Sequence, residues 1–201
     1  MLLAIDTSAG TSVAIVDRDR GVLASRDSAD TRGHAEVIGT YIADCLAESG
    51  ITVAELSGVV AGMGPGPFTG LRVGIAAARV FAVGAGKPVI AVVSHDALAF
   101  GLTEPTLITT DARRREVYWS RYGAPDPVGL PHREEGPALA KPDDLLTPEG
   151  YRRLDAATVS AAQLGLLAEA MYVHGRAFAG GEALYLRSPD VTLSAGPKRV
   201  S

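Results

Sequence analysis

The chain of 201 residues contains a single cysteine, so it cannot form an internal disulfide. Cys45 falls on the apolar side of an expected helix, which favours a packed thiol over a nucleophile. The sequence also lacks an apolar run of the ~20 residues that a membrane span needs. Its start shows neither a basic segment nor a cleavage site. These absences predict a cytoplasmic protein that does not enter a membrane.

Positive charge is also scarce. Nineteen Lys and Arg residues face 23 Asp and Glu residues, for a net charge of −4. A protein that binds RNA by itself usually carries a basic footprint, so we expect any RNA to be held by a partner. Three consecutive arginines, 113–115, stand out in an expected turn. A solvated basic turn is the favoured interpretation, and a salt-sensitive contact with RNA or an acidic partner is the alternative.

Motifs for metal binding and hydrolysis are missing. The four histidines lie far apart and form no His-x-x-x-His or His-Glu-x-x-His pair. The chain has no Gly-x-Ser-x-Gly motif either, and Cys45 has no recognisable histidine companion. The sequence therefore lacks the motifs of a hydrolase, and we expect no metal site. The histidines are His34, His95, His132 and His174.

The most distinctive stretch is the glycine- and proline-rich segment 62–74, which lies between an apolar run and a helical run. Glycine permits backbone angles that a Cβ forbids, and proline fixes φ, so the segment predicts a strand, a rigid turn and a helix. It lacks the lysine of a P-loop and the spacing of a dinucleotide fingerprint. Backbone amides could still bind an anion, but a shaped corner is the simpler interpretation. The turn residues are Gly64, Pro65, Gly66, Pro67, Phe68, Thr69, Gly70 and Arg72.

Hydrophobic patterning predicts an α/β protein. Strands are expected at 2–5, 11–16, 22–28, 59–61, 88–93, 106–110, 116–121 and 183–187, with one more edge strand within 123–150. Helices are expected at 34–49, 71–84 and 160–174, with a capping box at 52–55 and Ser94 as the N-cap of segment 95–101. Residues 188–201 are expected to form an exposed tail.

Four segments together resemble the TsaB (YeaZ) family of tRNA threonylcarbamoyladenosine biosynthesis. They are 3–8 (Leu-Ala-Ile-Asp-Thr-Ser), 64–74 (Gly-Pro-Gly-Pro-Phe-Thr-Gly-Leu-Arg-Val-Gly), 111–119 (Asp-Ala-Arg-Arg-Arg-Glu-Val-Tyr-Trp) and 185–187 (Tyr-Leu-Arg). The resemblance implies an actin/Hsc70/sugar-kinase-like (ASKHA, ribonuclease-H-like) fold with subdomains at 1–104 and 105–201. The second is expected to be shortened, with a disordered or missing loop near 148–160 in place of a strand that family members carry.

The resemblance also implies a role. The chain would be a non-catalytic subunit that forms a heterodimer with the transferase TsaD, helps dock the ATPase TsaE and contacts tRNA only indirectly. TsaD would transfer threonylcarbamoyl to the adenosine beside the anticodon. No cofactor of its own is implied, although ATP or ADP could sit at the partner interface, and a homodimer is expected for the isolated chain. Two alternatives remain: an independent ATPase or kinase using Asp6, and a peptidase.

Two groups of residues carry these expectations. The acid after the first strand faces nucleotide phosphates in this superfamily, so the resemblance makes the first group a vestigial phosphate site, although an ordinary turn explains it equally well. This group is Asp6, Thr7 and Ser8. The second group is an apolar helix seam to which the resemblance assigns the partner. It comprises Val37, Ile38, Tyr41, Ile42, Cys45, Gly74, Ala78 and Ala82.

Overall fold

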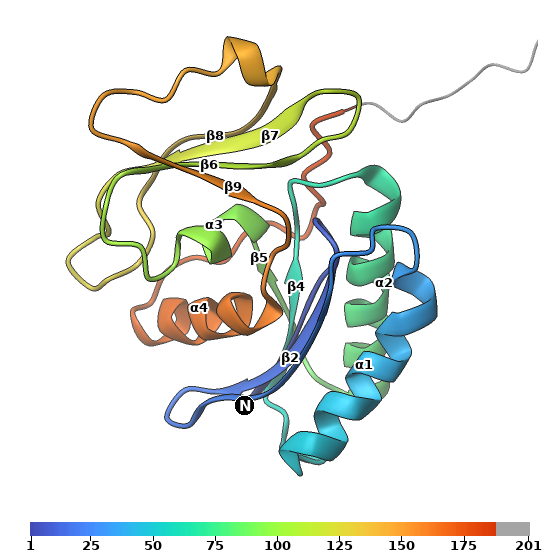
Figure 1. The fold of residues 1–201 in the computed structure, drawn as a ribbon. Helices are drawn as coiled ribbons and strands as arrows, with labels where there is room; N and C mark the ends of the chain where they lie inside the picture. Colours follow the sequence, from blue (N-terminus) through green and yellow to red (C-terminus); the bar gives the residue numbers. More distant parts are fainter. Residues whose placement is uncertain (188–201) are drawn as a thin grey trace, which may run out of the picture.

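A computed structural model describes residues 1–187, which form two sheets with helices around them (Figure 1). The predicted tail at 188–201 lies outside these described residues. The first sheet has the strand order β3-β2-β1-β4-β5. Strands β1, β2 and β3 are antiparallel, whereas β4 and β5 run parallel to β1. The strands are β1 (Leu2–Asp6), β2 (Thr11–Asp17), β3 (Gly21–Ser28), β4 (Gly58–Gly62) and β5 (Val89–Val92).

Helices cover both faces of this sheet (Figure 1). Helices α1 (His34–Ser49) and α2 (Phe68–Ala85) pack on one face, and α4 (Ala161–Val173) packs on the other. Alternate β1 residues serve the two layers, since Leu3 and Ile5 pack with α1 and α2 while Leu2 and Ala4 pack with α4. A strand covered on both faces is apolar along its length, which explains why β1 is buried throughout.

The second sheet has the order β8-β7-β6-β9, with β9 parallel to β6. Its strands are β6 (Thr106–Asp111), β7 (Val117–Tyr122), β8 (Arg133–Ala140) and β9 (Arg152–Ala156). Helix α3 (Ser94–Ala99) lies between this sheet and α4. Two 3-10 turns complete the described chain, η1 (Val53–Glu55) and η2 (Pro142–Asp144). Of the residues beyond 104, β6–β9 form this second sheet, whereas α4 returns to the first.

Most of the expected elements are confirmed, including the helix at 34–49, the capping box of Thr52 and Glu55, and an edge strand, β8, within 123–150. The expectation that a strand is missing between 151 and 160 is wrong. Strand β9 pairs with all but the last residue of β6, and only Leu154 and Ala156 give it an apolar signal. The strand expected at 183–187 is also wrong, because no ladder forms there.

The C-terminal part of the described chain instead passes β5 and the glycine-rich turn as an extended segment. The amide of Ala179 donates to the Ala91 carbonyl (3.0 Å), and the amide of Leu184 donates to the Met63 carbonyl (2.8 Å). The ring of Tyr185 packs on Phe68 at the start of α2, with ring centroids 4.8 Å apart. Isolated bonds of this kind fix the segment without making a strand.

Candidate functional site

The candidate site lies where β1 and β4 end and α2 begins. Asp6 is the last residue of β1, and its side chain is only 1% exposed. Its Oδ1 accepts hydrogen bonds from the Ser8 amide (2.8 Å) and the Ser8 hydroxyl (2.6 Å), and its Oδ2 accepts one from the Ser94 hydroxyl (2.5 Å). Burial raises the pKa of Asp6, and the hydrogen bonds from Ser8 and Ser94 oppose this shift.

Ser94 was expected to cap a helix at 95–101, and this expectation is wrong. The residue lies inside α3, whose N-cap is Val93. The hydroxyl of Ser94 donates to Asp6 and accepts a hydrogen bond from the Gly64 amide (3.0 Å). It therefore joins the end of β1 to the glycine-rich turn, a long-range role that a local capping rule does not reveal.

The glycine-rich turn is shaped by close approach to residues 6–8. A Cβ on Gly62 would lie 1.9 Å from Oδ2 of Asp6, and one on Gly74 would lie 2.2 Å from Oγ1 of Thr7. The Thr7 hydroxyl donates to the Gly70 carbonyl (2.6 Å) and accepts from the Gly74 amide (3.0 Å). The turn is therefore a tightly packed corner, as the simpler interpretation predicted.

The helix begins earlier than expected, at Phe68, so Phe68, Thr69 and Gly70 belong to α2 and not to the turn. Arg72 also lies in α2, within the helix expected at 71–84. Pro67 is the N-cap residue, and Gly64, Pro65 and Gly66 are buried beneath it. Pro67 presets φ at the helix entry, and its carbonyl accepts the Leu71 amide (3.0 Å).

This geometry tests whether Asp6 could hold a metal ion or a phosphate. Both carboxylate oxygens have protein donors, and Gly62 leaves no room even for a methyl group beside them. The arrangement does not fit either group. Within residues 1–187, no cluster of three or more His, Cys, Asp or Glu side chains could ligate a metal ion.

Two buried histidines pair with hydroxyl groups. Nδ1 of His34 lies 2.7 Å from Oγ1 of Thr11. The ring nitrogens of His95 lie 2.8 Å from the Ser120 hydroxyl and 2.9 Å from the Thr110 hydroxyl, which ties α3 to β6 and β7. Burial, with a smaller contribution from the charge of Arg133, lowers the pKa of His95 to about 3.

These pairs are not arranged as hydrolase machinery, because each hydroxyl is itself at most 3% exposed. Cys45 is fully buried, and burial raises the pKa of its thiol to about 11. In the sequence, His95 belongs to no recognisable motif. Its position directly after Ser94, at the end of a predicted strand, was the available signal that this junction is polar.

The predicted helix seam needs correction. Ile38, Cys45, Gly74, Ala78 and Ala82 are buried in the chain's own core, against the first sheet. Val37, Tyr41 and Ile42 are half-buried at its margin. Helical periodicity identified the stripe that faces the sheet, because a core and a partner select the same residue types.

The outward side of α2 nonetheless carries apolar residues beside the exposed Arg72 and Arg79. We define the α2 outer stripe as Ala76, Val80 and Val83. The side chains of Val80 and Val83 are 73% and 82% exposed. By length and mean hydropathy, α2 is the one helix within residues 1–187 that could span a membrane, but six of its residues pack inward on the core. The stripe is therefore an apolar surface on a helix that is anchored in the fold.

The arginine turn between β6 and β7 has an unusual backbone. Arg113, Arg114 and Arg115 have φ values of 64°, 54° and 61°, in the left-handed region that ordinary residues avoid. Each such residue costs about 1–3 kcal/mol, so surrounding contacts must hold it. The Arg113 amide donates to Oδ1 of Asp111 (2.8 Å), and the Glu116 amide donates to the Arg113 carbonyl (3.0 Å).

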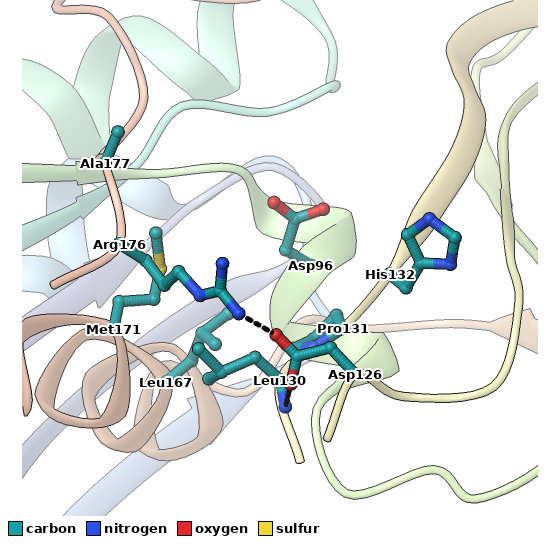
Figure 2. A pocket seen from close by; sticks show the side chains of 9 residues that line it. All are labelled: Asp96, Asp126, Leu130, Pro131, His132, Leu167, Met171, Arg176 and Ala177. Carbon is teal, nitrogen blue, oxygen red and sulfur yellow. Dashed lines mark hydrogen bonds and ion pairs between the residues drawn. The ribbon is translucent and has the colours of Figure 1, made fainter. Parts of the chain in front are cut away.

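A separate cavity of about 380 Å³ lies between α3, α4 and the loop before β8 (Figure 2). Its two carboxylates already have partners. Asp96 accepts a hydrogen bond from the Tyr122 hydroxyl (2.6 Å) and pairs with Arg133 (3.1 Å). Asp126 pairs with Arg176, the dashed contact in Figure 2, and accepts the Leu130 amide (2.9 Å). These contacts join α3 to β7 and β8, and they join the loop to the segment after α4, so both carboxylates have a structural role.

The sequence is similar to a family profile and to several known proteins. A profile described as TsaD, tRNA N6-adenosine threonylcarbamoyltransferase, matches residues 21–177. An uncharacterized protein of Mycobacterium tuberculosis is 47% identical over 123 residues, 60% of this chain and 58% of that protein. The Escherichia coli tRNA threonylcarbamoyladenosine biosynthesis protein TsaB is 34% identical over 147 residues, 71% of this chain and 63% of TsaB. The matches therefore span about three fifths of these curated relatives.

Solved structures with a similar fold include two proteins from Pseudomonas aeruginosa. One, described as an uncharacterized protein with similarity to peptidase YeaZ, has a TM-score of 0.77 and 26% identity, covering 92% of this chain and 99% of that one. The other, YeaZ, has a TM-score of 0.72 and 27% identity, covering 87% and 92%. This likeness confirms the predicted ASKHA-like fold.

Proposed function

Since the chain belongs to the family of the transferase TsaD and its TsaB (YeaZ) relatives, we propose that it is a non-catalytic subunit in tRNA threonylcarbamoyladenosine synthesis. It forms a heterodimer with TsaD and supports transfer of threonylcarbamoyl to the adenosine next to the anticodon. The complex then docks the ATPase TsaE in the cytoplasm. The chain has no cofactor of its own, and any ATP or ADP sits at the partner interface.

The observation that carries a non-catalytic role is the sealed carboxylate of Asp6. A superfamily ATPase or kinase needs an acid at this position that can reach phosphates or a metal ion. Here the side chain of Asp6 is 1% exposed, and its carboxylate oxygens accept hydrogen bonds from Ser8 and Ser94. A buried carboxylate with all its partners inside the protein stabilises the corner and leaves the chemistry to TsaD.

The α2 outer stripe supports a partner-binding role. Large apolar side chains such as Val80 and Val83 are rarely left this exposed in a row unless another surface covers them. Their helix is anchored by Leu71 and Ile75 in the core, so the stripe is presented on a rigid support. TsaD covers the stripe in the heterodimer, and a second copy covers it when the chain is alone.

Co-elution with TsaD on gel filtration tests this role. Val80→Arg places a charge in the desolvated contact and weakens the complex by at least about thirtyfold, or about 2 kcal/mol. Val128→Arg is the matched control, because Val128 is 43% exposed on the loop before β8. The control should co-elute normally. Unchanged co-elution of a folded Val80→Arg variant would refute this placement of the interface.

A further inference from the structure

Two adjoining cavities meet at the start of α2. The first, about 360 Å³, lies between Phe68, the arginine turn and Arg187. The second, about 290 Å³, extends toward Thr7, Arg32 and His34. Their linings share Pro67, Thr69 and Arg113, so the two cavities adjoin at the start of α2 and make a two-part groove. We call this the arginine groove.

Charge is strongly segregated in the arginine groove. Its charged lining residues are Arg32, Arg113, Arg114 and Arg187, and among residues 1–187 no carboxylate lines either cavity. This occurs in a chain whose net charge is −4. These arginines also have partners inside the protein, since Arg113 lies near Asp111 and donates to the Thr31 hydroxyl, and Arg187 pairs with Glu116. A guanidinium has five N–H donors, so one such pair does not exhaust it.

The backbone of the arginine turn and of the start of α2 also favours an anion site. The turn that carries Arg113 and Arg114 holds a left-handed conformation through three hydrogen bonds, so both side chains start from fixed positions. Strained backbone of this kind tends to occur where a ligand is bound. The N-terminus of α2 opens into the groove with neither a side-chain cap nor an acidic residue in its first turn. Its amides and its dipole add to the attraction for an anion.

Aromatic rings lie beside these charges. The rings of Phe68 and Tyr185 contact each other with centroids 4.8 Å apart, and the Arg72 guanidinium lies over the Phe68 ring, 3.9 Å from its centroid. Both rings line the groove together with Tyr118, which is only 2% exposed. Tyr185 is 40% exposed, so it can receive a planar group. A basic groove with an exposed aromatic ring, here that of Tyr185, is an arrangement by which proteins bind single-stranded nucleic acid, with phosphates on the arginines and a base on the ring.

We propose that the arginine groove binds a single-stranded stretch of RNA. The choice of RNA over other phosphate polymers rests on the proposed function, while the anion site rests on the groove itself. Direct contact of this kind replaces the expectation that tRNA is reached only through a partner. Because the whole chain is acidic, the contact is local and depends strongly on salt.

Fluorescence anisotropy with a labelled single-stranded oligoribonucleotide of about ten nucleotides tests the proposal. Alanine has a Cβ, as arginine does, so the combined variant Arg113→Ala and Arg114→Ala leaves the strain of the left-handed backbone unchanged. We expect it to bind at least about tenfold more weakly at low salt and to lower the slope of log affinity against log salt by about 1.4, or ~0.7 for each phosphate contact.

The control variant, Arg20→Ala and Arg152→Ala, removes the same charge from two exposed residues far from the groove. It should bind RNA like the parent. Equal losses in both variants, or no salt-dependent binding by the parent, would overturn the proposal. Binding of ADP as tight as that of the RNA would also overturn it, because the groove would then be a mononucleotide pocket.

The outcome is separable from the proposed function. The Arg113→Ala and Arg114→Ala variant should still co-elute with TsaD, because its substitutions lie outside the α2 outer stripe. Loss of RNA binding with intact co-elution supports the groove. Intact RNA binding by this variant rejects the groove and leaves the heterodimer untouched. Circular dichroism spectra that match the parent establish that each variant is folded.

Discussion

The hydroxyl of Ser94 lies 2.5 Å from Oδ2 of Asp6, a contact between residues 88 positions apart in the sequence. It joins the end of β1 to the start of α3, and the same hydroxyl accepts the amide of Gly64. Through this contact the Asp6 carboxylate is held inside the protein, where it stabilises the glycine-rich turn.

Ser94→Ala tests the strength of that support. The substitution leaves Oδ2 of Asp6 and the amide of Gly64 without their buried partner, and each loss is expensive when water cannot replace it. We expect the free energy of unfolding in urea to fall by about 2–4 kcal/mol. Ser57→Ala, at an exposed position, should change it by less than about 0.5 kcal/mol. Equal effects of the two substitutions would contradict the account.

Two glycines of α2 should respond in opposite directions to the same change. A Cβ on Gly74 meets Thr7, so Gly74→Ala should destabilise the fold by about 1–3 kcal/mol. A Cβ on Gly84 meets nothing within 4 Å, so Gly84→Ala should stabilise the helix by up to about 1 kcal/mol. Thermal melting of the two variants checks both signs. A stable Gly74→Ala protein would show that the corner is not tightly packed.

His95 should make stability depend on pH. Its folded pKa of about 3 lies below the ordinary value of 6.5, so the unfolded chain binds the proton more tightly. Its contribution is fully present above pH 6.5 and is lost as the pH falls toward 3. We expect a slope of up to about 1.4 kcal/mol per pH unit in this window. Urea titrations of the parent and of His95→Gln measure it, and a parent slope no steeper than that of the variant would count against the assignment.

Local patterns in the sequence were sufficient for most of the fold. Alternating or continuous apolar residues predicted the strands of the first sheet, and the spacing in 34–49 predicted α1 with both ends correct. The density of glycine and proline in 62–74 correctly indicated a packed turn. In each case the signal lies within a few residues, because burial of one element fixes its own pattern.

The remaining features depend on contacts between distant residues. Strand β9 has few apolar residues because it is an edge strand, so its sequence carries little signal. Periodicity found a stripe on α2 through Ala78 but not the outward stripe through Val80. The hydrogen bonding of the Asp6 carboxylate depends on Ser94. The arginine groove forms only because the fold brings Arg113 beside Arg32. No local pattern encodes these pairings.

The most direct measurement of the central claim is the threonylcarbamoyladenosine content of tRNA in cells depleted of this protein and supplied with variants. Asp6→Asn, which keeps the shape of the buried side chain, should restore the modification, whereas Val80→Arg should not. This result is expected if the chain acts through its surface. Full restoration by Val80→Arg together with none by Asp6→Asn would contradict the account, because the chain would then act through the chemistry of Asp6.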